Sequence, residues 1–330
     1  MEIIKENDKS KNKFLTFQSK YYDLENNFEF NQDNWKINGM IFASTALFIP
    51  FLMSLTSFLF FDLQTNETTQ LIVELIKIIS IAIGFIILGT KKTMKKYIKN
   101  GYGWLFFYTV IPIVSQIIFG IFAIFLMNNS EYFIAIIGII SAVISMLSLS
   151  IWIIIVDKKI TKIIKESFKI HPGSIIVTGL IGSLIAIVLI NFAFSYLEAL
   201  WSDGIADNQN ALISILDPES TASMNQKIIY AILLGVYVVI IAPFIEEVVV
   251  RHCWNLNTSN KWFAFITSSI FFGFLHYGST GDFAFALSYT ASGFIFGGLF
   301  LWSKGNITVV WLVHLFNNIF AFIILLMATF

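Results

Sequence analysis

Long runs of apolar residues constrain the fold of this chain more than any other feature. A helix that crosses a bilayer needs about 20 mostly apolar residues. Only 13% of the residues are charged, about half the share of a soluble domain. The sequence therefore predicts an all-α, polytopic transmembrane helix bundle of about eight to nine spans. The candidate runs lie at about 37–61, 70–90, 102–127, 132–156, 174–198, 228–250, 262–276, 283–302 and 307–329.

The first of these runs and the shortest one differ from an ordinary spanning helix in position and length. The first follows residues 1–36, so it begins too far into the chain for a cleaved signal peptide and is expected to be a retained span. The run at 262–276 is short. We expect it to start before Lys261 or to be buried among its neighbours, because it is too short to face lipid across a whole bilayer.

Lysine-rich loops predict the orientation of the bundle. The connections at 91–100 and 157–172 each carry five lysines, which marks cytoplasmic loops. The connections at 62–69, 128–131 and 199–226 are acidic. We therefore expect a multi-pass protein of the cell membrane with a cytoplasmic N-terminus and, if all nine runs span, an external C-terminus.

Ionisable residues divide the chain into parts. The expected organisation is a cytoplasmic segment at 1–36, an accessory transmembrane bundle at 37–198, an external loop at 199–226 and a C-terminal transmembrane domain at 227–330. Glu74 and Lys77 share a helix face in the accessory bundle and are expected to neutralise each other. Most other ionisable residues inside apolar runs lie in the C-terminal domain.

Charge and cysteine usage exclude several functions. The net charge is zero, and clusters of basic residues interleaved with aromatic residues are missing, so nucleic acid is not an expected partner. The single cysteine, Cys253, excludes an intramolecular disulfide and a metal site built on a cysteine pair. The expected partners are the lipid bilayer and a membrane-bound peptide or protein.

The first unusual segment places Glu246 and Glu247 within an apolar helix. Buried carboxylates are expensive to ionise in a membrane. Arg251 follows Glu247 by four residues, so it lies on the same helix face and can keep that acid ionised. Adjacent helix positions are about 100° apart, so Glu246 points elsewhere. Pro243 removes one backbone hydrogen bond just before the pair and can bend the helix. An interfacial Glu–Arg cluster is the structural alternative.

Two further segments place polar groups in apolar helices. His276 ends the run that contains Phe272, and His314 lies four residues before Asn318 on one helix face. Each segment alone has a structural explanation, as a satisfied interfacial histidine or as a hydrogen bond between helices. Together, a glutamate, two histidines and an asparagine from three helices suit water activation and oxyanion stabilisation. The chemistry that they predict is amide hydrolysis within the membrane.

The order of these segments resembles a known family. Glu246-Glu247-xxx-Arg251, Phe272-xxx-His276 and His314-xxx-Asn318 are similar to the three ordered motifs of the CPBP intramembrane proteases, also called the CAAX-prenyl endopeptidase or Abi family. The glycine-rich stretch at 293–298 and the turn at 305–307 also resemble that family. The resemblance covers about 225–325.

The resemblance implies a role for each motif residue. It makes Glu246 the base that activates water, with Glu247 and Arg251 positioning it. It implies that His276 helps to bind the water or the substrate carbonyl. It also implies that His314 and Asn318 form the oxyanion site. The family is also described as metalloproteases, which would make Glu246, His276 and His314 zinc ligands. We favour the metal-free version, because an HExxH motif is missing and Asn318 suits an oxyanion better than zinc.

The sequence is also compatible with two other classes of function. One is a membrane scaffold or bacteriocin-immunity protein that binds a peptide or partner protein without cutting it. The other is a transporter, although inverted repeats are not visible in the sequence.

The sequence also poses a geometrical problem for the site. With Asn255 and Lys261 near the cytoplasmic boundary, Glu246 and His314 lie about 12–14 Å deep, whereas His276 lies about 22 Å deep. Helix tilt or an irregular helix end must remove this difference if the three residues meet.

Overall fold

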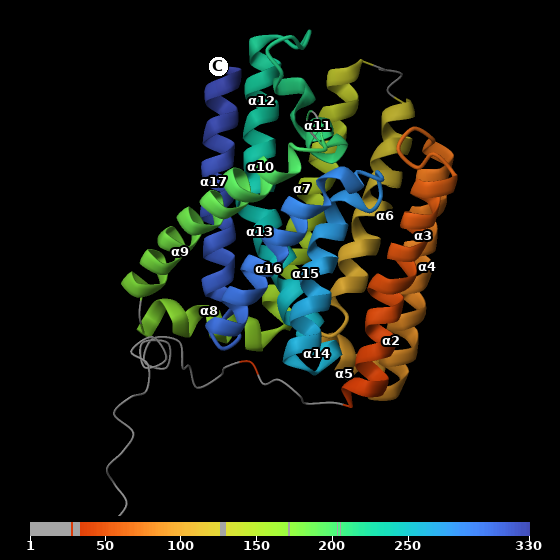
Figure 1. The fold of residues 1–330 in the computed structure, drawn as a ribbon, viewed down its shortest axis with the longest axis vertical. Helices are drawn as coiled ribbons and strands as arrows, with labels where there is room; N and C mark the ends of the chain where they lie inside the picture. Colours follow the sequence, from red (N-terminus) through yellow and green to blue (C-terminus); the bar gives the residue numbers. More distant parts are fainter. Residues whose placement is uncertain (1–27, 29–33, 126–129, 171, 203, 205) are drawn as a thin grey trace, which may run out of the picture.

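The computed structural model describes residue 28 and residues 34–125, 130–170, 172–202, 204 and 206–330 (Figure 1). The cytoplasmic segment expected at 1–36 lies almost entirely outside these residues. The described part of the chain contains helices, turns and connecting segments without strands. Eight helical stretches are long and apolar enough to cross a membrane, which confirms the predicted polytopic all-α bundle. They are Trp35–Phe60, Glu67–Lys92, Trp104–Phe122, Tyr132–Val156, Pro172–Glu198, Met224–Thr258, Phe283–Trp302 and Ile307–Thr329.

The first half of the bundle consists of four long helical stretches and an amphipathic helix. The first stretch contains π-helical segments at Trp35–Gly39 and Ser44–Phe48. Its α-helices and those that follow are α2 (Met40–Ala43), α3 (Ile49–Phe60), α4 (Glu67–Lys92), α5 (Met94–Lys99), α6 (Trp104–Phe125), α7 (Glu131–Val156) and α8 (Lys158–Ile170). The expected pair on α4 is confirmed, because Lys77 Nζ lies 2.6 Å from Glu74 Oε1.

The second half begins with α9, which crosses α17, and ends with α17 itself (Figure 1). Its elements are α9 (Pro172–Ile187), the π-helical η3 (Val188–Phe194), α10 (Ser195–Glu198), α11 (Asp207–Ile213), the 3₁₀ turn η4 (Ser214–Leu216) and α12 (Met224–Gly235). They continue with the π-helical η5 (Val236–Ile241), α13 (Ala242–Glu247), the π-helical η6 (Val248–Cys253) and α14 (Trp254–Thr258). The last elements are α15 (Lys261–Tyr277), the 3₁₀ turn η7 (Phe283–Phe285), α16 (Ala286–Trp302) and α17 (Ile307–Thr329).

Helix α15 is the short apolar run of the sequence. It has 17 residues and starts at Lys261, after Asn260 accepts hydrogen bonds from the backbone N–H groups of Trp262 and Phe263. It packs along α16, where a side chain at Gly293 would collide with the backbone of Ser269. Together with α14 and η6, α16 buries nine residues of α15. The expectation that this run is sunk among its neighbours is therefore confirmed.

The helix that carries Glu246 extends further than the sequence suggested. It continues through η6 and α14 to Thr258 and turns at Ser259, which has a left-handed φ of 54°. Counted from Thr258 and Lys261, the helix ends on either side of this turn, Glu246 lies about 18 Å and His276 about 22 Å along their helices. The difference between Glu246 and His276 is therefore smaller than the one predicted with Asn255 at the boundary.

The two ends of the bundle differ in charge. The lysine-rich connections at 91–100 and 157–172 contain the helices α5 and α8, which lie at the end of the bundle that also holds α14 (Figure 1). Helix α8 buries Ile160, Ile163 and Ser167 on one face. Helix α11 and the start of α12 lie toward the opposite end, where the expected loop at 199–226 is partly helical.

Candidate active site

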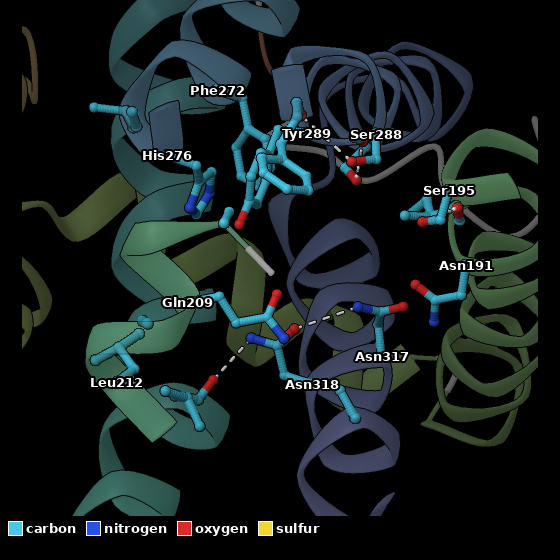
Figure 2. A pocket seen from close by; sticks show the side chains of 18 of the residues that line it. Asn191, Ser195, Gln209, Leu212, Phe272, His276, Ser288, Tyr289, Asn317 and Asn318 are labelled. Atoms are coloured by element: carbon cyan, nitrogen blue, oxygen red, sulfur yellow. Dashed lines mark hydrogen bonds between the residues drawn. The ribbon is translucent and has the colours of Figure 1, made fainter. Parts of the chain in front are cut away.

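A cavity of about 620 Å³ lies in the C-terminal half of the bundle (Figure 2). Side chains from α6, η3, α10, α11, η5, α13, α15, α16 and α17 line it. Four of the predicted site residues reach its wall, namely Glu246, His276, His314 and Asn318. The other two, Glu247 and Arg251, lie behind the wall and are fully buried. The structure thus brings the three sequence motifs to one place.

Glu247 connects two of the motifs. Its Oε2 accepts a hydrogen bond from Nε of Arg251 at 3.1 Å, and its Oε1 lies 2.9 Å from Nδ1 of His314. The bond to Arg251 follows from the i, i+4 spacing, as predicted. The bond to His314 joins residues 67 positions apart and could not be derived from spacing. A buried carboxylate needs such partners, because burial without them is strongly unfavourable.

The guanidinium of Arg251 is held on several sides. Besides Glu247, it reaches the hydroxyl of Ser268 from Nη1 at 3.3 Å and lies 5.3 Å above the ring of Phe272. These contacts use the planar fork of arginine, which a lysine ammonium cannot reproduce. Arg251 therefore joins η6 to α15 as well as keeping Glu247 ionised.

His314 is oriented toward the cavity by Glu247. An Nδ1–H that donates to the carboxylate fixes the ring and leaves Nε2 on the cavity side. That Nε2 lies 3.9 Å from Oε2 of Glu246. The ring stacks on Phe296 at a centroid distance of 4.7 Å. The imidazole consequently lies between two carboxylates, one buried and one at the cavity wall.

Glu246 differs from its neighbour in both exposure and partners. Its side chain retains 12% of its accessibility, whereas that of Glu247 has none. Its one ion pair among the described residues is the contact with His314. The prediction that adjacent positions would separate the two acids is met by this geometry. Glu246 is thus free to contact a ligand in the cavity.

His276 lines the same cavity without an ion pair. Its ring stacks on Tyr289 at 4.7 Å with an interplanar angle of 9°, and its edge meets Phe272 at 5.2 Å. Figure 2 shows the imidazole beside these two rings. Aromatic contacts therefore fix the plane of the ring, and its nitrogens have no hydrogen bond to another described residue.

Asn318 is anchored by an irregular turn of a neighbouring helix. The N–H of Ala242 bonds to Tyr237 O in η5, and Pro243 has no N–H. The carbonyl of Val238 thus loses its helical donors, and Nδ2 of Asn318 donates to it at 2.8 Å. Asn317 donates from Nδ2 to Oδ1 of Asn318 at 3.3 Å. Together these bonds orient the Asn318 amide and leave its second N–H hydrogen uncommitted.

Several cavity residues could not be found from motif spacing. Glu198 was visible as an acid at the end of a span, and Asn317 as the neighbour of Asn318, but neither signal indicated a shared cavity. Tyr108, Tyr237 and Tyr289 complete the wall from three different helices. Tyrosines in apolar helices carry no pattern that distinguishes a cavity wall from a packed core.

The alternative zinc assignment concerns Glu246, His276 and His314. The described part of the chain contains no preformed group of three His, Cys, Asp or Glu side chains that could hold a metal. Oε2 of Glu246 lies 3.9 Å from Nε2 of His314, whose Nδ1 is bonded to Glu247. A carboxylate on the second ring nitrogen also supports many zinc-bound histidines. Metal dependence therefore stays a prediction, which elemental analysis tests.

The order and arrangement of the motifs agree with a comparison with known families. Residues 228–320 match the family model described as Type II CAAX prenyl endopeptidase Rce1-like. This C-terminal domain belongs to the CAAX protease family. The family consists of peptide hydrolases, so the chain is an intramembrane endopeptidase of the CAAX type. The match covers all six predicted site residues.

The accessory helices also have a counterpart. An uncharacterized protein of Mycoplasma capricolum subsp. capricolum is 28% identical to this chain over 313 residues, which cover 92% of this chain and 91% of the relative. The similarity therefore includes the helices before the CAAX protease domain. No solved structure matches the chain.

Proposed function

We propose that this CAAX protease family member hydrolyses a peptide bond of a membrane-associated peptide or protein with a water molecule that Glu246 activates. One observation carries the proposal. Of two adjacent carboxylates, Glu247 is bound by both Arg251 and His314, whereas Glu246 faces the cavity with a single contact at 3.9 Å. A carboxylate that is buried and lightly partnered beside a cavity suits a general base.

The first step is attack by water on the substrate carbonyl. Glu246 accepts a proton from the water while the water oxygen bonds to the carbonyl carbon. The carbonyl oxygen gains the negative charge of the tetrahedral intermediate. Collapse of the intermediate breaks the carbon–nitrogen bond, and Glu246 returns its proton to the leaving nitrogen. The base is regenerated, so a single carboxylate serves both proton transfers.

The oxyanion is stabilised by fixed donors. We assign His314 to this role in its protonated form, with Nδ1–H held by Glu247 and Nε2–H directed to the oxyanion. The charges then balance, because the carboxylates of Glu246 and Glu247 are matched by two cations, His314 and Arg251. The second N–H hydrogen of Asn318 is the other donor, pre-oriented by Val238. His276, held by Tyr289, positions the water or the carbonyl.

The position of the cavity indicates from which side substrate arrives. Its lining includes Ala199, Gly204 and Gln209, which are exposed residues of the α10–α11 region. This region lies away from the lysine-rich helices α5 and α8. If the lysine-rich end is cytoplasmic, the cavity opens toward the external side. We infer a membrane-bound peptide from the external half of the bilayer as substrate, rather than a prenylated protein in the cytosol.

The direct test is the Glu246→Gln protein. The amide has nearly the shape of the acid and cannot accept the proton, so we expect turnover to be lost while expression and thermal stability are retained. Cleavage of membrane peptides is measured in liposomes and by proteomics of membrane peptides from cells with and without the change. Glu74→Gln, which alters an acid outside the cavity, is the matched control.

Two outcomes would contradict the proposal. Activity of Glu246→Gln within threefold of wild type would remove the assignment of the base. Peptide binding by wild type without any cleavage would instead favour the non-proteolytic scaffold or immunity protein.

A further inference from the structure

A second carboxylate lines the active-site cavity from outside the CAAX protease domain. Glu198 belongs to α10, upstream of the matched residues 228–320. Only 4% of its surface is accessible. Its Oε1 accepts a hydrogen bond from the backbone N–H of Ser288 at 3.1 Å, and its Oε2 accepts one from the Ser288 hydroxyl at 2.6 Å. The carboxylate is thereby held in one orientation at the start of α16.

Glu198 has no basic partner among the described residues. Two other acids of the bundle are paired with cations, Glu74 with Lys77 and Glu247 with Arg251. Ionisable groups inside a membrane protein normally pair in this way. Each oxygen of Glu198 accepts a single bond from Ser288, so each has a further acceptor position for a donor.

The cavity around Glu198 offers acceptors and negative charge. Its lining contains Glu198 and Glu246 but no lysine or arginine. Oδ1 of Asn317 is buried and has no hydrogen-bond partner among the described residues. Figure 2 shows Asn191 beside Asn317, and Ser195 between Asn191 and Ser288. A ligand with a free carboxylate would meet repulsion here, whereas a cationic ligand would be attracted.

We propose that Glu198 is a specificity-determining residue that binds a lysine or arginine side chain of the substrate peptide. The inference rests on the proposed function, because it places this side chain in the cavity while Glu246 acts on a nearby peptide bond. A volume of about 620 Å³ lies in the range of pockets that enclose a ligand of a few residues. The fixed carboxylate is pre-organised, so little ordering is required when the cation binds.

The experiment compares membrane-anchored peptides that are identical except at one position, which carries lysine, norleucine or glutamate and is scanned along the sequence. At one position we expect kcat/KM for lysine to exceed that for norleucine by about tenfold, with glutamate the poorest. In Glu198→Gln, this preference should fall below about threefold. Glu74→Gln should keep the full preference.

A second variant separates charge from helix capping. Ser288→Ala removes the hydroxyl donor but keeps the charge of Glu198, so it should lower thermal stability and retain the preference for lysine. If Glu198→Gln does not fold, the wild-type scan decides by itself. A scan in which lysine is favoured at no position would overturn the proposal.

Binding to the Glu246→Gln protein distinguishes failure of this inference from failure of the proposed function. It is measured by fluorescence anisotropy with the same peptides and requires no turnover. Tighter binding of the lysine peptide without any cleavage by wild type would support the cation site and contradict the protease assignment. Cleavage with equal rates for lysine and norleucine would do the opposite.

Discussion

The molecule contains two buried pairs of a carboxylate and an imidazole, and their surroundings differ. In the cavity, Nδ1 of His314 lies 2.9 Å from Glu247. Near the lysine-rich end, Nε2 of His252 lies 3.3 Å from Asp157. Each pair joins segments that are far apart in the sequence. The same chemistry therefore occurs in a region with a proposed reaction and in a region without one.

The difference lies in what surrounds each pair. Both oxygens of Asp157 contact structural donors, since Oδ2 also accepts from the indole N–H of Trp104 at 3.2 Å and Oδ1 accepts from the backbone N–H of Ile160 at 3.2 Å. The hollow of about 300 Å³ beside it is lined by lysines and contains no other carboxylate. The His314 pair instead has Glu246 on its open side. We infer that a buried pair becomes a reaction site when a second, lightly partnered acid shares its cavity.

The largest loss of activity that tests this comparison is expected from removing an oxyanion donor. Asn318→Ala removes one fixed donor and should lower kcat by about 100–1000-fold, with little change in substrate affinity. It also frees the Val238 carbonyl, so thermal stability is measured in parallel. Asn210→Ala, at an exposed position of α11 outside the cavity lining, is the matched control.

The same variants address a metal mechanism. If zinc were required, Asn318→Ala would be mild, and His276→Ala or His314→Ala would release a stoichiometric metal. Elemental analysis of the detergent-solubilised protein measures this. One zinc per chain, lost with activity in either histidine variant, would contradict the glutamate mechanism.

The next effect concerns the support behind the cavity. Arg251 is the single arginine among 21 basic residues. Arg251→Lys keeps the charge but cannot bind Glu247 and Ser268 while lying over Phe272, so we expect roughly a tenfold loss of kcat/KM together with lower thermal stability. Unchanged activity and melting temperature would show that the guanidinium fork is dispensable.

The sequence predicted which motif residues meet better than it predicted their supporting contacts. Spacing along one helix was sufficient to pair Glu247 with Arg251 and to separate Glu246 from them, because helix geometry is local. The contact of Glu247 with His314 depends on how α13 packs against α17. The anchor of Asn318 depends on a π-helical turn, which apolar periodicity does not reveal because every residue of η5 is apolar or aromatic.

Hydropathy along the sequence also did not predict the full length of some helices. The connection at 157–172 was expected to be a loop, and most of it forms α8, whose lysines alternate with buried isoleucines. The run through Glu246 was expected at about 228–250, but its helix continues to Thr258. The polar side chains of Asn255, Asn257 and Thr258 are buried there and bonded to backbone carbonyls, so the helix continues where hydropathy falls.

A smaller effect is expected at the second pair, and on stability alone. Asp157→Asn weakens the contacts to His252 and Trp104 and should reduce the free energy of unfolding by about 1–3 kcal/mol. The folded variant should retain wild-type kcat, since Asp157 does not line the active-site cavity. Thermal melts and turnover in the same detergent measure the two quantities. A large loss of kcat would show that the two regions are coupled.

The smallest effect is the pH dependence of the stability that Asp157→Asn loses. Burial raises the pKa of Asp157. A hydrogen bond and charge from His252, together with hydrogen bonds from Trp104 and Ile160, lower this pKa by a larger amount, so the net shift is downward. A lowered pKa means that the ionised form stabilises the folded state. This contribution is complete above the ordinary aspartate value near pH 4 and is lost as pH falls through the folded pKa. The deficit of Asp157→Asn should therefore shrink as the pH is lowered from about 5 to 3.

Asp207 gives a control with the opposite sign. The neighbouring carboxylate of Asp282, with a smaller effect of burial, raises the pKa of Asp207. A raised pKa means that the ionised form destabilises the folded state, so Asp207→Asn should slightly raise the melting temperature at pH 7. That gain should also disappear as pH falls and the wild-type carboxyl becomes protonated. Melting temperatures of both variants from pH 7 to 3 measure these trends. If both variants deviated from wild type with the same sign, Asp157 would not be the ionised structural partner that distinguishes its region from the cavity.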